Sequence, residues 1–259
     1  MSNNKNDEGF TSSPTISSNT LFHFTDGENL ISILKEGFKP HLCMEDLNFF
    51  LTDEPTEEDA EELQHAIPMI CFCDIPLSQS KNHMSTYGNY GIGLNKDWGK
   101  RNSISPVLYA YKKSKITSVI QQILINFPND ILWYDLYCIF CFTKAYEGRK
   151  EKEGRFSDEI IRFYDEREWR YVPPIEDFHD CCLYKREYLD KSHRRYIQDR
   201  LDKMPLNFEA SDIKYIIVSS EEKIIHIIDE IEKMDRFDKN DKKLLYSRII
   251  SAKQINEDF

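Results

Sequence analysis

The chain has 259 residues, with 34 Lys or Arg against 45 Asp or Glu, so its formal net charge is −11. This length suffices for one large domain or two small ones, and the acidic balance disfavours wholesale wrapping of nucleic acid or docking on an anionic membrane. No apolar run approaches the roughly 20 residues of a membrane span, and no secretory signal pattern opens the chain. Seven cysteines, an odd number, favour a reducing cytoplasm over a disulfide scaffold.

The N-terminal part of the chain predicts a polar tail followed by a strand–helix unit. Residues 1–18 are rich in Ser, Asn and Thr, which is typical of a disordered tail. The run LFHFT (residues 21–25) predicts a short buried strand that presents His23 and Thr25 at its end. An amphipathic helix with N-cap residues at its start and Gly37 at its end follows. His23 is either a partly buried hydrogen-bonding group or a site residue, and this stretch leaves both readings open.

Two stretches in the first half of the chain carry further candidate residues. The run from Ile67 to Pro76 is apolar on both faces and predicts a central strand, with Asp74 at its end. The segment YGNYGIGL (residues 87–94) predicts a glycine-rich turn that enters a strand. The rings of Tyr87 and Tyr90 in that segment either cap the core or stack on a ligand.

The middle of the chain predicts helices, a charged break and a charged strand. Residues 116–127 have helical apolar spacing, residues 131–146 predict a buried helix, and the run 147–159 predicts a charged loop. Residues 163–172 predict a strand on which Glu166, Glu168 and Arg170 share one face. A carboxylate held there beside arginines is either a reactive acid or part of an ordinary salt bridge.

The C-terminal part predicts a basic helix, a strand and two further helices. The motif HDCC (residues 179–182) lacks a partner pair with zinc-ligand spacing, so no metal is expected. The helix predicted over 185–203 gathers cations between tyrosines and is the candidate nucleic-acid contact. Its candidate contact residues are Arg194, Arg195 and Arg200. A clean strand at 213–220 leads into an amphipathic helix, and a charged helix over 239–253 closes the chain. We therefore expect one domain over residues 19–236 with a C-terminal helix at 237–259 packed on it.

Three of these stretches follow the order His, Tyr, Glu, namely HFT, YGNYGIGL and EWRYVP. That order is similar to the ADP-ribosyltransferase superfamily of the H-Y-E type, and the opening FHFT…ILKEGF resembles the DarT toxins, which ADP-ribosylate DNA. More closely, FHFT…CFCDIPL…H…YGNYGIGLNKDW…EWRYVP resembles the AbiGi family of bacterial abortive-infection proteins over about residues 20–220. That family carries the label of antitoxin in a phage-defence pair.

The resemblance implies a fold, a substrate and roles for the candidate residues. The fold would be α+β, an ADP-ribosyltransferase-like split, mixed β-sheet of about six strands surrounded by helices. NAD would be the substrate, and Glu168 would be the catalytic carboxylate that stabilises an oxocarbenium-like ribose and holds its 2′-hydroxyl. Tyr87 or Tyr90 would stack on the nicotinamide, and His23 would bind the adenosine ribose with support from Thr25. Further candidates for the NAD site are Asp74, His83 and Arg170.

Two functions of different classes follow from this resemblance. The first is an NAD-dependent ADP-ribosyltransferase toxin or effector of an anti-phage system, which modifies a macromolecule, nucleic acid being favoured. A cognate antitoxin or another defence-system protein would restrain it. The second is a catalytically inactive antitoxin or sensor that binds a partner protein. A metal-dependent nuclease built on Asp74, Glu166 and Glu168 ranks last, because no metal-ligand spacing supports it.

Overall fold

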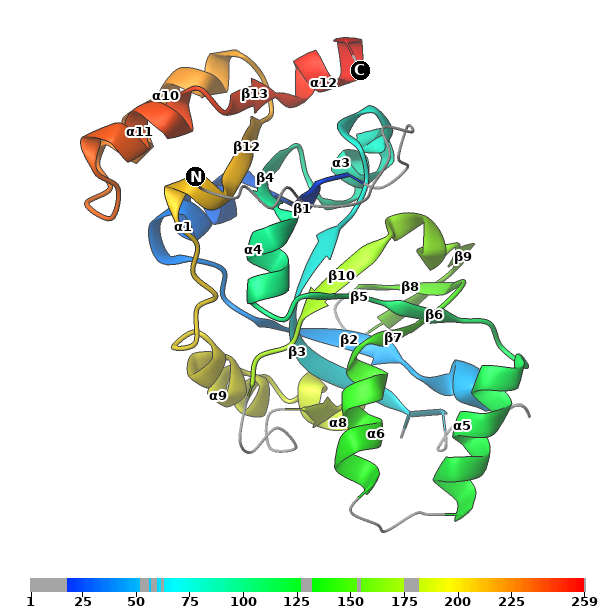
Figure 1. The fold of residues 1–259 in the computed structure, drawn as a ribbon. Coiled ribbons are helices and arrows are strands. Elements are labelled where there is room, and N and C mark those ends of the chain that lie inside the picture. The colour runs from blue at the N-terminus through cyan, green and yellow to red at the C-terminus, as the bar shows by residue number, and fades with distance from the viewer. Residues whose placement is uncertain are drawn as a thin grey trace, which may run out of the picture.

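The computed structural model in Figure 1 describes residues 18–51, 56, 60–61, 63–126, 132–152, 155–174 and 182–258. Nearly all of the predicted tail and of the HDCC motif lies outside these residues. The described chain forms a mixed α+β fold, as the sequence predicts, but its main sheet has nine strands rather than six. Seven strands follow one another in the order β13–β12–β4–β1–β3–β10–β5, and β2 and β11 also pair with β3. The strands are β1 (Thr20–Thr25), β2 (His41–Asp46), β3 (Gln64–Cys73), β4 (Tyr90–Asn95), β5 (Ser105–Pro106), β10 (Glu168–Tyr171), β11 (Leu183–Tyr184), β12 (Ile213–Val218) and β13 (Ile249–Ser251).

β3 is the longest strand that the structure describes, and it joins the two halves of this sheet. Its first half pairs with β2 and β11, and its second half pairs with β10. The apolar run of the sequence suits this position, because Ala66, Ile67, Met69 and Phe72 are all buried on one face or the other. The predicted central strand is therefore confirmed.

β1 and β3 form the point where the sheet opens. β1 pairs with β4 along its whole length but meets β3 at a single residue pair, Phe22 and Cys73. Beyond that pair the Nδ1 atom of His23 lies 2.8 Å from the backbone carbonyl oxygen of Cys71, so the imidazole donates a hydrogen bond to it. The histidine side chain thus bridges the two strands where their regular ladder stops.

Helices cover both faces of the sheet around β1. On one face, α1 (Gly27–Glu36), α4 (Lys96–Arg101), α10 (Glu222–Glu232) and α11 (Lys239–Tyr246) enclose a core that includes Leu21 and Trp98. On the other face, α3 (Lys81–Tyr87) and α12 (Ala252–Asp258) cover Phe22 and Phe24. α1 is capped as its sequence predicts, since the Asp26 carboxylate accepts a hydrogen bond from the Asn29 backbone N–H at 2.8 Å.

A third core lies at the other end of the molecule (Figure 1) around β2 and the start of β3. It is built with α5 (Lys115–Asn126), α6 (Leu132–Cys141), α8 (Lys185–Leu189), α9 (Lys191–Leu201) and the short helix η1 (Asn48–Phe50). Two small sheets flank this end, β6 (Leu108–Ala110) with β7 (Thr143–Ala145), and β8 (Gly148–Lys152) with β9 (Arg155–Ile161). Within the described residues, no helix is long and apolar enough to cross a membrane.

Two predicted elements between residues 131 and 159 differ from the structure. The predicted helix over 131–146 is wrong beyond Cys141, because Thr143 turns its hydroxyl back onto the carbonyl of Ile139 and starts β7. The predicted charged loop at 147–159 is instead largely a hairpin of β8 and β9. The sequence did not indicate these strands because most of their residues are charged, and a hairpin at the surface does not require an alternating apolar face.

Two later predictions also differ from the structure. The predicted strand over 163–172 begins only at Glu168, because residues 163–166 form the short helix η3 (Phe163–Glu166) and Arg167 has a left-handed backbone with φ of 45°. Glu166 and Glu168 therefore do not share one strand face. The predicted closing helix is two helices, α11 and α12, with β13 between them, and β13 extends the main sheet by parallel pairing with β12.

Gly88, which directly follows α3, lies against the backbone at the end of β1 and offers a test of this arrangement. Its φ of 124° is one that other residues rarely adopt, and a Cβ atom there would overlap the backbone carbonyl oxygen of Thr25. We expect Gly88→Ala to lower the free energy of unfolding by about 3 kcal/mol or more. Chemical denaturation measures this, with the exposed α3 substitution Thr86→Ala as control. Equal midpoints for the two variants would contradict the close approach of α3 to β1.

Candidate functional site

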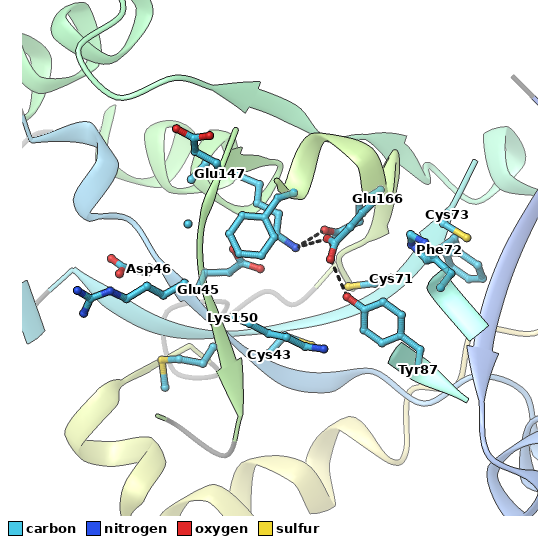
Figure 2. Close-up of a pocket in the computed structure, with 18 of the residues that line it drawn as sticks. Cys43, Glu45, Asp46, Cys71, Phe72, Cys73, Tyr87, Glu147, Lys150 and Glu166 are labelled. Atoms are coloured by element: carbon cyan, nitrogen blue, oxygen red, sulfur yellow. Dashed lines mark hydrogen bonds and ion pairs between the residues drawn. The ribbon is translucent and has the colours of Figure 1, made fainter. Parts of the chain in front are cut away.

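A cavity of about 360 Å³ lies where β1 and β3 diverge. Its walls come from β1, β2, the end of β3, α3, the segment from β7 into β8, and η3 with the start of β10. Figure 2 shows that charged side chains and thiols from these elements face one another across the hollow. The volume lies in the range of small-molecule sites, which are usually enclosed by several elements of this kind.

Glu168, the first residue of β10, is the centre of an ion network at this cavity. One oxygen of its carboxylate accepts a hydrogen bond from Arg170 Nε at 2.6 Å, and the other accepts one from Lys144 Nζ at 2.8 Å. Its backbone N–H donates to the hydroxyl of Tyr109 at 2.8 Å. Glu168 is only 5% exposed, so it lies in the wall of the cavity with both carboxylate oxygens engaged.

Arg170 extends this network into the core. Its guanidinium is fully buried and donates from Nη2 to the Glu45 carboxylate at 2.6 Å and from Nη1 to the Cys141 carbonyl at 2.8 Å. β10 is thereby joined to β2 and to the end of α6. A buried guanidinium with partners on three sides fits the planar, forked geometry of the group.

The charges in the network fix one another's ionisation. Burial by itself would raise the pKa of Glu168, but the charges of Arg170 and Lys144 outweigh it and hold that pKa well below its usual range. Burial would lower the pKa of Lys144, yet the facing carboxylates of Glu168 and Glu166 raise it well above its ordinary value. At neutral pH the Glu168 carboxylate is therefore ionised, and it forms ion pairs with both cations, which also bind Glu45 and Glu166.

A second set of contacts lies at the rim of the cavity. The Tyr87 hydroxyl donates to Glu166 at 2.7 Å, and Figure 2 shows the two side chains pointing toward each other. The other oxygen of Glu166 accepts a hydrogen bond from Lys144 at 2.9 Å. The ammonium of Lys150 lies 5.6 Å from the centre of the Tyr87 ring. This rim offers an aromatic face together with a cation and a carboxylate.

Two histidines and three cysteines also line the cavity. Burial lowers the pKa of both His23 and His83, so both imidazoles are neutral at physiological pH. The His23 ring also packs edge-on against Phe38 and Phe72. Cys43, Cys71 and Cys73 are free thiols. A hydrogen bond with Cys43 raises the pKa of Cys71, and burial raises the pKa of Cys73. Thiols that stay protonated are poor nucleophiles.

The structure brings together some of the residues that the sequence predicts for a site. His23, His83, Tyr87 and Glu168 line the one cavity, and Arg170 lies directly behind Glu168. The structure separates the two candidate tyrosines, because Tyr90 lies in a different hollow beside α1 and α10 and accepts a hydrogen bond from Ser219.

The other predicted site residues lie apart from the cavity. Thr25 pairs with Tyr90 at the far end of β1. Asp74 is buried with its carboxylate 2.7 Å from the Lys96 ammonium and 3.8 Å from the Arg167 guanidinium. Arg194, Arg195 and Arg200 lie on α9, which packs beside β2. None of these residues is in the cavity wall, although Thr25 and Asp74 lie next to the wall residues Phe24 and Cys73 in the chain.

Sequence reasoning missed Tyr109 and Lys144 as partners of Glu168, and Glu45 as a partner of Arg170. Glu166 carried a signal, because it stands in the same charged run as Glu168. The other three come from distant segments with no unusual composition, and Glu45 is 125 residues from the arginine that it contacts. Glu45 reaches Arg170 because β2 and β10 both pair with β3, and Tyr109 and Lys144 are opposite each other where β6 pairs with β7.

The comparisons with known proteins concern this same part of the chain. A family model described as "Putative abortive phage resistance protein AbiGi, antitoxin" matches residues 36–219. The chain belongs to the AbiGi family. A protein named "Abortive phage resistance protein AbiGi" from Lactococcus lactis subsp. cremoris is 33% identical to it over an alignment of 222 residues. That alignment covers 74% of this chain and 89% of the relative. No solved structure matches the chain significantly.

These matches confirm the predicted resemblance to AbiGi, and the family region contains the whole ion network. Neither description names an ADP-ribosyltransferase or NAD. The AbiGi match begins at residue 36, so it includes Glu168 and Tyr87 but not His23.

Arg170→Met tests whether the buried network stabilises the fold. The substitution leaves Glu168 and Glu45 buried without their main counter-ion, so we expect the free energy of unfolding to fall by about 3–5 kcal/mol. The control is Arg195→Met, since the Arg195 side chain is 83% exposed and its ion pair with Asp199 lies at the surface. That variant should lose about 1 kcal/mol or less. Similar small losses in both variants, measured by chemical denaturation, would show that the network contributes little.

His23→Gln tests the neutral state of the buried histidine. Because burial lowers the pKa of His23, the unfolded chain binds a proton near pH 6.5 that the folded chain does not bind. Stability should therefore fall as the pH drops, and the largest loss that His23 alone can cause between pH 7.5 and 5.5 is about 1.4 kcal/mol. Glutamine keeps a hydrogen-bond donor and removes this loss. Denaturation curves at both pH values should show a smaller pH effect in His23→Gln, whereas the exposed substitution His226→Gln should match the parent chain.

Proposed function

We propose that this chain is the antitoxin of an abortive-infection pair, a non-catalytic protein that binds and restrains the toxic protein of the same defence system. The observation that carries the proposal is the engagement of Glu168. A carboxylate that assists ribosyl transfer needs an oxygen free to face the sugar, whereas both oxygens of Glu168 bind Arg170 and Lys144. The family's description as an antitoxin supports the same function.

The charge of the chain suits such a role. Its formal net charge of −11 favours rapid association with a partner whose docking face is basic, because complementary charge mainly raises the association rate. The ion network beneath the cavity would then serve to hold β2, α6 and β10 in fixed positions rather than to carry out chemistry.

One observation favours a second candidate, an NAD-dependent ADP-ribosyltransferase. His23, Tyr87 and Glu168 line the same cavity, and these are the residue types that the H-Y-E resemblance requires. In that function Glu168 would hold the ribose, Tyr87 would stack on the nicotinamide and His23 would bind the adenosine ribose. Lys144 or Arg170 would first have to release an oxygen of Glu168.

Expression in a bacterial host separates the two functions. As an antitoxin, the chain alone should leave growth and cellular NAD unchanged, and co-expression should restore growth to cells that make the toxic protein of its system. The two proteins should also co-purify. Growth arrest by the chain alone, with NAD loss that disappears in Glu168→Gln, would overturn the antitoxin role in favour of the transferase. The exposed substitution Glu222→Gln serves as control, and circular dichroism checks that each variant is folded.

A further inference from the structure

Four tyrosines from three separate segments form a continuous row beside the cavity. The rings of Tyr146 and Tyr164 stack at a centroid distance of 5.4 Å with 27° between their planes. Tyr111 contacts Tyr146 at 6.1 Å, and Tyr109 contacts Tyr164 at 5.3 Å, both edge to face. We call these four residues the tyrosine row.

Backbone hydrogen bonds hold the tyrosine row in place. The Tyr146 N–H donates to the Ala110 carbonyl at 2.9 Å, and the Tyr164 N–H donates to the Tyr146 carbonyl at 3.1 Å. At its inner end, the Tyr109 hydroxyl accepts the hydrogen bond from the Glu168 N–H in the cavity wall. Its outer rings are open to solvent, with Tyr164 50% and Tyr111 59% exposed. The row is a fixed aromatic surface that leads from the cavity to the outside.

Cations surround the tyrosine row although the chain as a whole is acidic. The three segments that supply it, residues 109–115, 146–150 and 162–165, contain six Lys or Arg and two acidic residues. Lys113 and Lys115 are exposed beyond Tyr111, and Arg149 is exposed on β8. Figure 1 shows β6, β7 and β8 together on one side of the molecule. In a chain with a net charge of −11, this is a local basic surface.

We propose that the tyrosine row binds single-stranded nucleic acid, with bases stacked on the exposed rings of Tyr111 and Tyr164 and phosphates beside the surrounding lysines and arginines. Exposed aromatic rings in series with flanking cations are the features by which proteins hold single strands without sequence preference. A duplex hides the faces of its bases, so it cannot use the row. This binding goes beyond the antitoxin function and does not rest on it.

The row fits this ligand better than the helix that the sequence alone suggested. On α9, Arg195 lies 4.0 Å from the Asp199 carboxylate, and the Arg194 guanidinium lies over the Tyr188 ring. Residues 185–203 also carry four acidic residues among their cations. The charges of α9 are therefore partly compensated within the helix, whereas the run from Lys112 to Lys115, which ends at the first residue of α5, carries three lysines and no acid.

Fluorescence anisotropy with the purified full-length chain tests the proposal. The probes are labelled 12-nucleotide oligothymidine, oligouridine of the same length, and a blunt DNA duplex. At low salt we expect at least one single strand to bind ten times more tightly than the duplex, with an affinity that falls as salt rises. Comparison of the affinities for oligothymidine and oligouridine shows whether the tyrosine row prefers DNA or RNA.

Matched variants decide whether the tyrosine row is the binding surface. Tyr164→Ala should weaken single-strand binding about tenfold, because a stacked base is lost, and Tyr164→Phe should bind like the parent chain. The control is Tyr196→Ala on α9, where the side chain is 62% exposed, and its affinity should not change. Absence of single-strand binding, or equal effects of Tyr164→Ala and Tyr196→Ala, would overturn the proposal. So would loss of co-purification with the toxic protein in Tyr164→Ala if its oligonucleotide affinity were unchanged.

Discussion

The buried contact between Glu168 and Arg170 is the interaction on which this part of the fold depends. Arg170 joins β10 to β2 through Glu45 and to the end of α6 through the Cys141 carbonyl. Lys144 joins β7 to the Glu168 carboxylate. Each of these charges is tolerable in the core only because its partners are present, since an ion left alone there would be strongly unfavourable. The network therefore fixes how the small sheets at one end of the molecule meet the main sheet.

The same network shapes the cavity and limits its chemistry. The opening exists because β1 leaves β3 after a single residue pair, and His23 bridges the strands at that point. Glu168 closes the far wall with both oxygens occupied, and the neighbouring thiols and imidazoles are held in their neutral forms. This pocket contains the residue types of an enzyme site, but its polar groups are bound to one another as they are in a structural core. That contrast is why membership of the AbiGi family, with its description as an antitoxin, weighs toward binding over catalysis.

The surface of the molecule divides its charge unevenly. The chain is acidic overall, and its basic helix α9 carries acidic residues of its own, yet the segments around the tyrosine row are locally basic. Four rings meet there, from β6, from the residues that directly follow β6 and β7, and from η3, because backbone hydrogen bonds join Ala110 to Tyr146 and Tyr146 to Tyr164. An antitoxin built this way would have an acidic exterior for a protein partner and a separate aromatic surface for a second ligand.

The sequence by itself determined the local units and the family. The apolar run of β3, the strand of β1 with its capped helix α1, and the motifs that resemble AbiGi are properties of neighbouring residues, so periodicity and motif spacing reveal them. Only the tertiary structure decided that Tyr87 rather than Tyr90 faces the cavity, and that Lys144 and Glu45 surround the Glu168–Arg170 pair. Those contacts join segments far apart in the chain, and a charged residue carries no local pattern that names its distant partner. The left-handed turn at Arg167, which separates Glu166 from Glu168, is likewise set by packing rather than by propensity.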